Sequence, residues 1–208
     1  MIKLVVLDFD YTLVGSEVGF YDVKEHKKEE FKRRNLWKIV KELTHEYKSV
    51  FNVAEKLGID VKDVERAAEE IELERMKKSY LIEGARELLD FLRQNNIKIA
   101  LLTGNCRKAV LYALEKHGIK DYFDALLTRD ECALEDMKPN TKCYLKLLEE
   151  FGAKEEEAIL IGDSEADLLP VKSVKIIIGD KVKGDYNARN LKEAVSLLKK
   201  LIGEEDGH

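Results

Sequence analysis

Five short apolar runs alternate with segments of helical periodicity, and this alternation constrains the fold more than any other feature of the 208-residue chain. The runs are rich in Val, Ile, Leu and Ala, and each is short enough for a buried strand. They lie at residues 3–7, 97–102, 124–127, 158–161 and 174–178. Strands that alternate with helices form a parallel sheet with helices on both faces. The sequence therefore predicts an α/β fold, a three-layer sandwich around a five-stranded parallel sheet.

Residues 17–79 interrupt this alternation between the first strand and the second. They are highly charged, they contain helical patterns around residues 36–47 and 64–71, and they hold no convincing strand. An insertion of about 60 residues is longer than an ordinary loop. We therefore expect an α/β core domain from residues 1–14 and 81–208, and a small helical cap domain from residues 15–80.

The charge balance and the apolar pattern exclude several classes of protein. The chain has 36 Lys and Arg against 41 Asp and Glu, a net charge of −5, so no strong field attracts nucleic acid or an anionic membrane. No apolar run approaches the roughly 20 residues of a membrane span, and the N-terminus does not resemble a signal peptide. We expect a cytoplasmic protein, a monomer or a homodimer, that binds neither nucleic acid nor membrane.

The three cysteines give little sign of a disulfide or a metal site. Cys106, Cys132 and Cys143 form no C-x-x-C pair, and no His stands at ligand spacing from them. Thiols of a reducing compartment are the favoured interpretation.

Polar residues that could do chemistry follow the predicted strands at their carboxyl ends, which form the functional edge of a parallel sheet. Asp8, Asp10 and Thr12 follow the first strand, and residues 103–105 (Thr-Gly-Asn) follow the second. Gly162, Asp163, Ser164 and Asp167 follow the fourth, and Lys138 precedes a proline after the third. Paired carboxylates with a third from another strand suit Mg²⁺, which takes hard oxygen ligands.

Each of these features has a plainer explanation when it is taken alone. Asp8 and Asp10 could be solvated loop acids or helix caps, and Thr103 or Asn105 could be an ordinary helix N-cap. Lys138 could be a surface lysine, and Asp163 could be favoured merely because acids suit a helix start. Their occurrence together favours a phosphate and metal site.

Four of these segments resemble, in order, the four motifs of the haloacid dehalogenase superfamily. They are DFDYT (8–12), LLTGN (101–105), Lys138-Pro139 and GDSEAD (162–167). The insertion looks like the helical cap of the phosphoglycolate-phosphatase-like branch, and the resemblance covers nearly the whole chain. It implies a Rossmann-like, HAD-like core with a small all-helical cap. Tyr11 stands where Gly is most often found, Gly15 where many members carry an acid, and Glu83 where Pro is common.

The resemblance also implies a role for each site residue. Asp8 is expected to be the nucleophile and Asp10 the general acid and base. Mg²⁺ is expected at Asp8, Asp163 and the backbone carbonyl of Asp10. The expected phosphate-binding groups are Thr103, Gly104, Asn105 and Lys138, and the expected supporting residues are Asp167, Thr12 and Ser164.

These roles predict a phosphoric monoester hydrolase, a Mg²⁺-dependent phosphatase that acts on a small phosphorylated metabolite such as phosphoglycolate through an aspartyl-phosphate. Asp10 argues for phosphoryl transfer over dehalogenation, because a halide leaves without a proton. Two alternatives remain open at this point. One is a sugar-phosphate mutase of the same branch, and the other is a non-catalytic binding or regulatory protein that keeps the fold.

Overall fold

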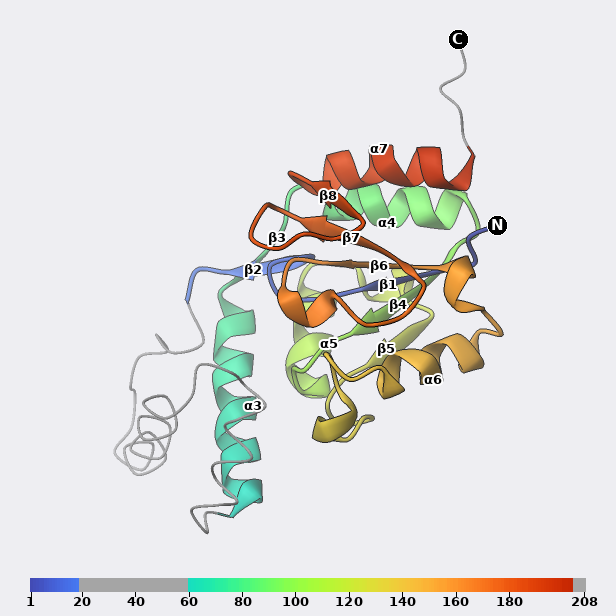
Figure 1. Ribbon diagram of the computed structural model, residues 1–208. Helices are drawn as coiled ribbons and strands as arrows, with labels where there is room; N and C mark the ends of the chain where they lie inside the picture. Colours follow the sequence, from blue (N-terminus) through green and yellow to red (C-terminus); the bar gives the residue numbers. More distant parts are fainter. Residues whose placement is uncertain (19–59, 204–208) are drawn as a thin grey trace.

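The centre of the protein is a parallel sheet of six strands (Figure 1). The computed structural model describes residues 1–18 and 60–203. The strand order is β5-β4-β1-β6-β7-β8, and every neighbouring pair is parallel. The strands are β1 (Leu4–Leu7), β4 (Lys98–Leu102), β5 (Ala125–Leu127), β6 (Ala158–Gly162), β7 (Val174–Ile178) and β8 (Tyr186–Ala188).

The five predicted strands are confirmed, but the predicted number of strands was too low by one. The sixth strand, β8, pairs with β7 at one edge of the sheet. Its first two residues, Tyr186 and Asn187, are exposed, and only Ala188 is buried. An edge strand with a single buried residue leaves no apolar run in the sequence, so the pattern that revealed the other strands could not reveal this one.

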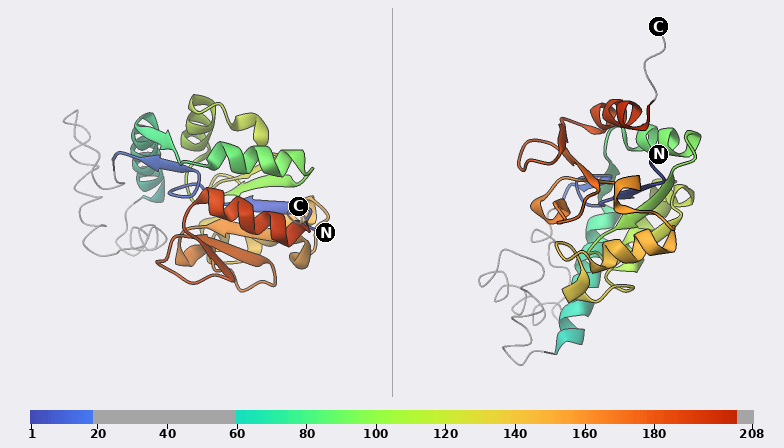
Figure 2. Two further views of the ribbon diagram at one scale, coloured as in Figure 1. Left: turned by 90° about the horizontal axis from the view of Figure 1, so that it is seen from above. Right: turned by 45° about the vertical axis from the view of Figure 1, so that its right-hand side comes forward.

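Helices cover both faces of the sheet, as predicted. The alternation along β1 sends Val5 and Leu7 into one apolar cluster and Leu4 and Val6 into the other. The first cluster is covered by α4 (Ala85–Gln94), α5 (Arg107–Lys116) and α7 (Leu191–Ile202), and the second by α6 (Lys142–Glu150). Figure 2 shows α4 and α7 side by side on their face. In the described part of the chain, 3-10 turns lie at Lys120–Tyr122, Leu134–Asp136, Glu155–Glu157 and Glu165–Asp167.

Two short strands mark the ends of the insertion. β2 (Val14–Ser16) pairs antiparallel with β3 (Ser79–Leu81), so residues 15–16 and 79–80 are strand where a helical segment was expected. Gly15 lies opposite Tyr80, and a Cβ at this glycine would overlap the Tyr80 ring. A side chain at position 15 would therefore require the Tyr80 ring, which is 48% exposed, to move.

The described helix of the insertion, α3 (Val61–Lys77), confirms the helix predicted around residues 64–71. The helix predicted around 36–47 lies outside the described residues. α3 begins at Asp60, whose side chain accepts a hydrogen bond from the Lys62 backbone N–H at 2.9 Å. None of the helices in residues 60–203 is long and apolar enough to cross a membrane.

α3 packs against α5 of the core with a face that contains charged residues. Ala68 and Met76 are fully buried on this face, and so is the carboxylate of Glu72. Arg75 is 4% exposed. Two buried charges need partners, and both partners lie in the site described next.

Candidate active site

The turn after β1 places Asp8 and Asp10 at the carboxyl end of the central strand. The backbone closes tightly there, because the Leu13 and Val14 N–H groups both donate to the Phe9 carbonyl, at 3.0 and 3.1 Å. Tyr11 has φ +56°, in the left-handed region that favours glycine and costs other residues about 1–2 kcal/mol. This geometry gives a physical reason why glycine is common at the position of Tyr11 in the family that the sequence resembles.

Asp8 is held by two side chains, and both were predicted to belong to the site. Lys138 Nζ donates to Asp8 Oδ1 at 2.6 Å, and Thr12 Oγ1 donates to Asp8 Oδ2 at 3.3 Å. Thr12 is fully buried, and the Lys138 side chain is 8% exposed. Both carboxylate oxygens of Asp8 are thereby fixed in direction, with one cation beside them.

Lys138 reaches Asp8 from the long loop between β5 and α6, where the Lys138-Pro139 peptide bond is cis. Its ammonium also donates to Asp167 Oδ1. Burial disfavours the charged ammonium, but the charges of Asp8 and Asp167 outweigh burial and raise the pKa of Lys138. Lys138 is therefore a permanent cation between two carboxylates.

Asp167 is tied to the loop that follows β6. Its Oδ2 accepts from the Ser164 hydroxyl at 2.8 Å and from the backbone N–H groups of Ser164 and Asp163 at 3.1 and 3.2 Å. A Cβ at Gly162 would overlap the Asp167 carboxylate, so only glycine lets this side chain come so close. These contacts hold Asp167 and Ser164 together beside Lys138, and the supporting role expected for them stays a prediction.

Asp8, Asp163 and Asp167 form a cluster that could hold a metal ion. One carboxylate oxygen from each lies within 4.8 Å of the other two. Burial, and after it the charge of Asp167, raises the pKa of Asp163 to about 6. Within residues 1–18 and 60–203, no hydrogen-bond donor contacts the Asp163 carboxylate, whereas Asp167 is occupied by Lys138 and Ser164. Asp163 therefore fits a direct ligand best, and Asp8 comes next, because its Oδ2 has only the 3.3 Å contact with Thr12.

The electrostatics of Asp8 point to the same need for a cation. Burial raises the pKa of Asp8 from 3.8 to about 7, and the charges of Asp167 and Asp10 add to the rise. Lys138 opposes it but does not cancel it. One lysine is therefore not enough to keep Asp8 ionised at neutral pH. A divalent cation beside the carboxylate would favour its charged form.

The Thr103-Gly104-Asn105 segment lies beside Asp10. Thr103 is buried at the end of β4, and its Oγ1 accepts from the Asn105 backbone N–H at 3.2 Å. The Asn105 side-chain amide donates to Asp10 Oδ2. A Cβ built on Gly104 meets nothing within 4 Å, so space lies open above this backbone. The structure thus joins two of the predicted motifs directly, through Asn105 and Asp10.

Three charged residues at this edge were not predicted from the sequence. Arg75 Nη2 forms an ion pair with Asp10 Oδ1 at 3.0 Å. Glu72 pairs with Arg129, whose guanidinium also donates to the Gly104 carbonyl at 3.3 Å. In the sequence, Glu72 and Arg75 stand at helical spacing from Ala68 and Met76, and this spacing is their only sign. Charged residues on a helix usually face solvent, so the pattern does not indicate that these two are buried in the site.

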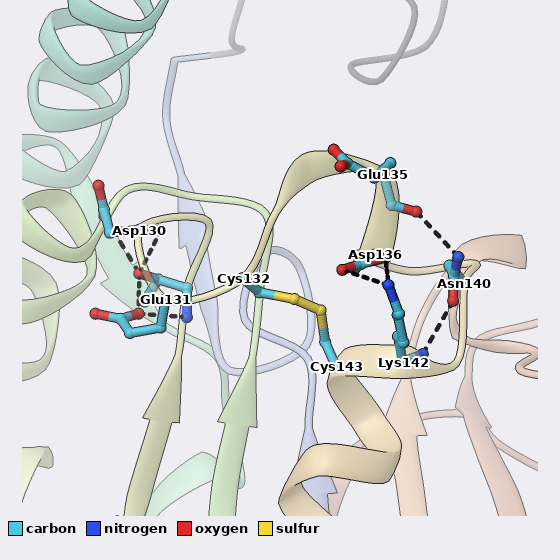
Figure 3. The surroundings of a disulfide bond; sticks show 9 residues. Asp130, Glu131, Cys132, Glu135, Asp136, Asn140, Lys142 and Cys143 are labelled. Atoms are coloured by element: carbon cyan, nitrogen blue, oxygen red, sulfur yellow. Dashed lines mark hydrogen bonds and ion pairs between the residues drawn. A yellow bond between two sulfur atoms is a disulfide. The ribbon is translucent and has the colours of Figure 1, made fainter.

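A disulfide joins the two ends of the loop that carries Lys138 (Figure 3). It links Cys132 to Cys143, and their Cα atoms are 6.2 Å apart, within the ordinary span of about 4.4–6.8 Å. The expectation that these two cysteines are thiols was therefore wrong, because sequence spacing does not show that a loop brings its ends together. The expectation holds for Cys106, a buried free thiol whose pKa burial raises to about 12.

Curated proteins similar to this chain carry names of phosphate-releasing enzymes. The chain is 29% identical over 110 residues to pyrophosphatase PpaX of Halalkalibacterium halodurans, covering 51% of this chain and 50% of that protein. It is 36% identical over 95 residues to phosphoglycolate phosphatase of Vibrio parahaemolyticus, covering 46% and 41%. The matched segments thus span about half of these relatives or less.

Solved structures agree with the fold over nearly the full chain. A HAD phosphatase from Thermococcus onnurineus superposes with a TM-score of 0.63 at 22% identity, covering 99% of this chain and 100% of that one. CbbY from Rhodobacter sphaeroides, solved in complex with phosphate, gives 0.65 at 20% identity, covering 92% and 95%. A sequence model of the haloacid dehalogenase-like hydrolase family matches residues 5–184. Because this match spans most of the chain, the protein belongs to the haloacid dehalogenase-like hydrolase family.

Proposed function

We propose that the protein is a Mg²⁺-dependent phosphatase that hydrolyses a small phosphorylated metabolite through a phosphoryl group carried on Asp8. The observation that carries this proposal is the setting of Asp8 at the end of the central strand. One of its oxygens is fixed by Lys138 and the other by Thr12, and carboxylate oxygens of Asp163 and Asp167 lie within 4.8 Å of it. The names of the curated relatives support phosphoryl chemistry, with pyrophosphate and 2-phosphoglycolate as the first substrates to test.

In the first step, a carboxylate oxygen of Asp8 attacks phosphorus. The bond between phosphorus and the ester oxygen breaks, its electron pair leaves with the alkoxide, and Asp10 supplies a proton to that oxygen. Lys138 compensates the negative charge that gathers around Asp8 and the phosphoryl oxygens. The Thr103 hydroxyl and the backbone N–H groups of residues 104–105 are proposed to donate to those oxygens.

In the second step, water attacks the phosphorus of the phosphorylated Asp8. Asp10, now a carboxylate, takes the proton from the water, and the bond from phosphorus to Asp8 breaks to restore the free side chain. Mg²⁺ would be held by Asp8, Asp163 and the Asp10 carbonyl, and when bound it supplies positive charge to the phosphoryl oxygens.

The test measures inorganic phosphate released from p-nitrophenyl phosphate, pyrophosphate, 2-phosphoglycolate and a panel of sugar phosphates. Each substrate is run with Mg²⁺ and with EDTA, on the wild type, Asp8→Asn and Asp124→Asn. Asp124 is the matched control because its side chain is 14% exposed, like that of Asp8, but lies at the amino end of the sheet, where it accepts from the Ile99 N–H.

We expect release that needs Mg²⁺, persists in Asp124→Asn and is lost in Asp8→Asn. Acid quenching followed by mass spectrometry should find the phosphoryl group on Asp8. Turnover near the wild-type level in Asp8→Asn would refute the nucleophile assignment. Phosphorylation of Asp8 with isomerised sugar phosphate and no inorganic phosphate would indicate a mutase instead.

A further inference from the structure

Asp10 is held from both sides by groups that come from different parts of the chain. Arg75 Nη2 contacts Oδ1 at 3.0 Å, and the Asn105 amide donates to Oδ2. The Asp10 side chain is 28% exposed, whereas that of Arg75 is 5% exposed. The carboxylate is therefore partly open to the site, while the guanidinium that fixes its direction is buried behind it.

Arg75 also connects the two ends of the insertion. Its Nε donates to the Val18 carbonyl at 3.4 Å, and its own carbonyl accepts from the Ser16 hydroxyl at 3.1 Å. The same hydroxyl accepts from the Val18 N–H at 3.2 Å. One residue in the last turn of α3 thus contacts the chain entering the insertion and Asp10 together.

The helix that carries Arg75 is itself attached to the core. Glu72, one turn earlier, accepts from the Cys106 backbone N–H at 2.8 Å and pairs with Arg129. At the end of α3, Lys116 of α5 donates to the Lys77 carbonyl at 2.9 Å. These contacts, of which those of Glu72 are buried, fix the position and rotation of α3 against residues 103–106, so the guanidinium reaches Asp10 from a rigid support.

We infer that Arg75 is a positioning residue that holds the Asp10 carboxylate in the direction required for proton transfer. This inference rests on the proposed function, because it assigns Arg75 a role through Asp10. An arginine suits the task because its planar fork contacts the Val18 carbonyl with Nε and Asp10 with Nη2. A lysine presents a single ammonium and cannot hold both positions in one geometry.

The role predicts a distinctive kinetic signature. p-Nitrophenolate leaves without a proton, so phosphorylation of Asp8 by p-nitrophenyl phosphate does not need Asp10, whereas the attack of water still does. Slowing only the second of two steps lowers kcat and KM by the same factor and leaves kcat/KM unchanged. An alkyl phosphate needs the proton in its first step, so its kcat/KM should fall as well.

The experiment compares the wild type with Arg75→Met, Arg75→Lys and Lys77→Met in the full-length protein with Mg²⁺. Lys77 is the control because its substitution removes a positive charge from the same helix turn, and its ion pair is with exposed Glu74. For Arg75→Met and p-nitrophenyl phosphate, we expect kcat and KM to fall together by about 10- to 100-fold, with a burst of nitrophenol. Arg75→Lys should recover part of kcat, and Lys77→Met should match the wild type.

A second measurement separates positioning from a merely structural role. In the Asp10→Asn background, Arg75→Met should cause no further loss, because the group that it positions is gone. A fall in kcat at constant KM, on both esters and additive with Asp10→Asn, would mean that Arg75 only supports folding and would overturn the inference. Wild-type protein without phosphate release from any ester would overturn the proposed function itself, and the role of Arg75 with it.

Discussion

Replacing Asp8 by Asn should stabilise the metal-free protein, and the gain should grow with pH. The pKa of Asp8 is about 7 in the folded protein and 3.8 in its ordinary state. Between these values the folded protein keeps a proton that the unfolded chain has released, so the free energy of unfolding falls as pH rises. Above pH 7 the penalty is complete, because Asp8 is then ionised in both states.

The size of the effect follows from the shift. The difference of 7 − 3.8 = 3.2 units corresponds, at about 1.4 kcal/mol per unit, to an upper limit of about 4 kcal/mol. Between pH 5 and pH 8 only the part from 5 to 7 is lost, which is about 2–3 kcal/mol. The amide introduced by Asp8→Asn would also be a weaker partner for Lys138, but this cost is the same at both pH values and cancels from the comparison.

The assay is urea unfolding in EDTA at pH 5 and pH 8 for the wild type, Asp8→Asn and Asp124→Asn. The stability of Asp8→Asn relative to the wild type should rise by about 2–3 kcal/mol between the two pH values. The pKa of Asp124 shifts in the opposite direction from that of Asp8. Burial would raise its pKa, but hydrogen bonds from Ile99 and Lys98 outweigh burial and lower it, so its linkage acts only below about pH 4. The reasoning would be refuted if the stability of Asp8→Asn relative to the wild type changed as little with pH as that of Asp124→Asn.

Three further predictions concern the surroundings of Asp8. Lys138→Met should reduce phosphate release by about 10²–10³-fold at saturating substrate, and a smaller loss than tenfold would argue against its electrostatic role. Glu72→Gln should lower the free energy of unfolding by about 3–5 kcal/mol in urea, since it breaks a buried ion pair with Arg129, and the Glu72→Gln/Arg129→Met double variant should lose less than the sum of the two single variants. Reduction of the Cys132–Cys143 bond, which closes a separation of 11 residues, should lower that free energy by about 3 kcal/mol, whereas the double Ser variant should not respond to reductant.

The strands and the four motif segments could be predicted because short-range patterns encode them. Each of the five predicted strands is an apolar run between polar residues, and each predicted site residue follows a strand end. The structure places Asp8, Lys138, Asp163 and Asp167 around one point and Asp10 beside Asn105. Parallel topology alone brings such strand ends to a common edge.

The remaining features depend on contacts between distant segments. Nothing near Arg75 in the sequence indicates Asp10, 65 positions away. Glu72 and Arg129 are 57 positions apart, and their ion pair forms only when α3 packs against the core. The disulfide requires a loop path that brings its two ends together. Such pairings follow from tertiary packing, which a single sequence does not encode in its local pattern.

The pairing of β2 with β3 has a consequence for how proteins of this shape can change over generations. The chain leaves the core at Ser16 and returns at Ser79, which are register partners in that ribbon. Any stretch of polypeptide whose own ends lie close together can therefore be exchanged between these two points by recombination without altering the path of β1. Exchange that keeps α3 would also keep Arg75 next to Asp10. The inserted sequence can thus vary while the strand ends that carry Asp8 and Asp163 stay unchanged.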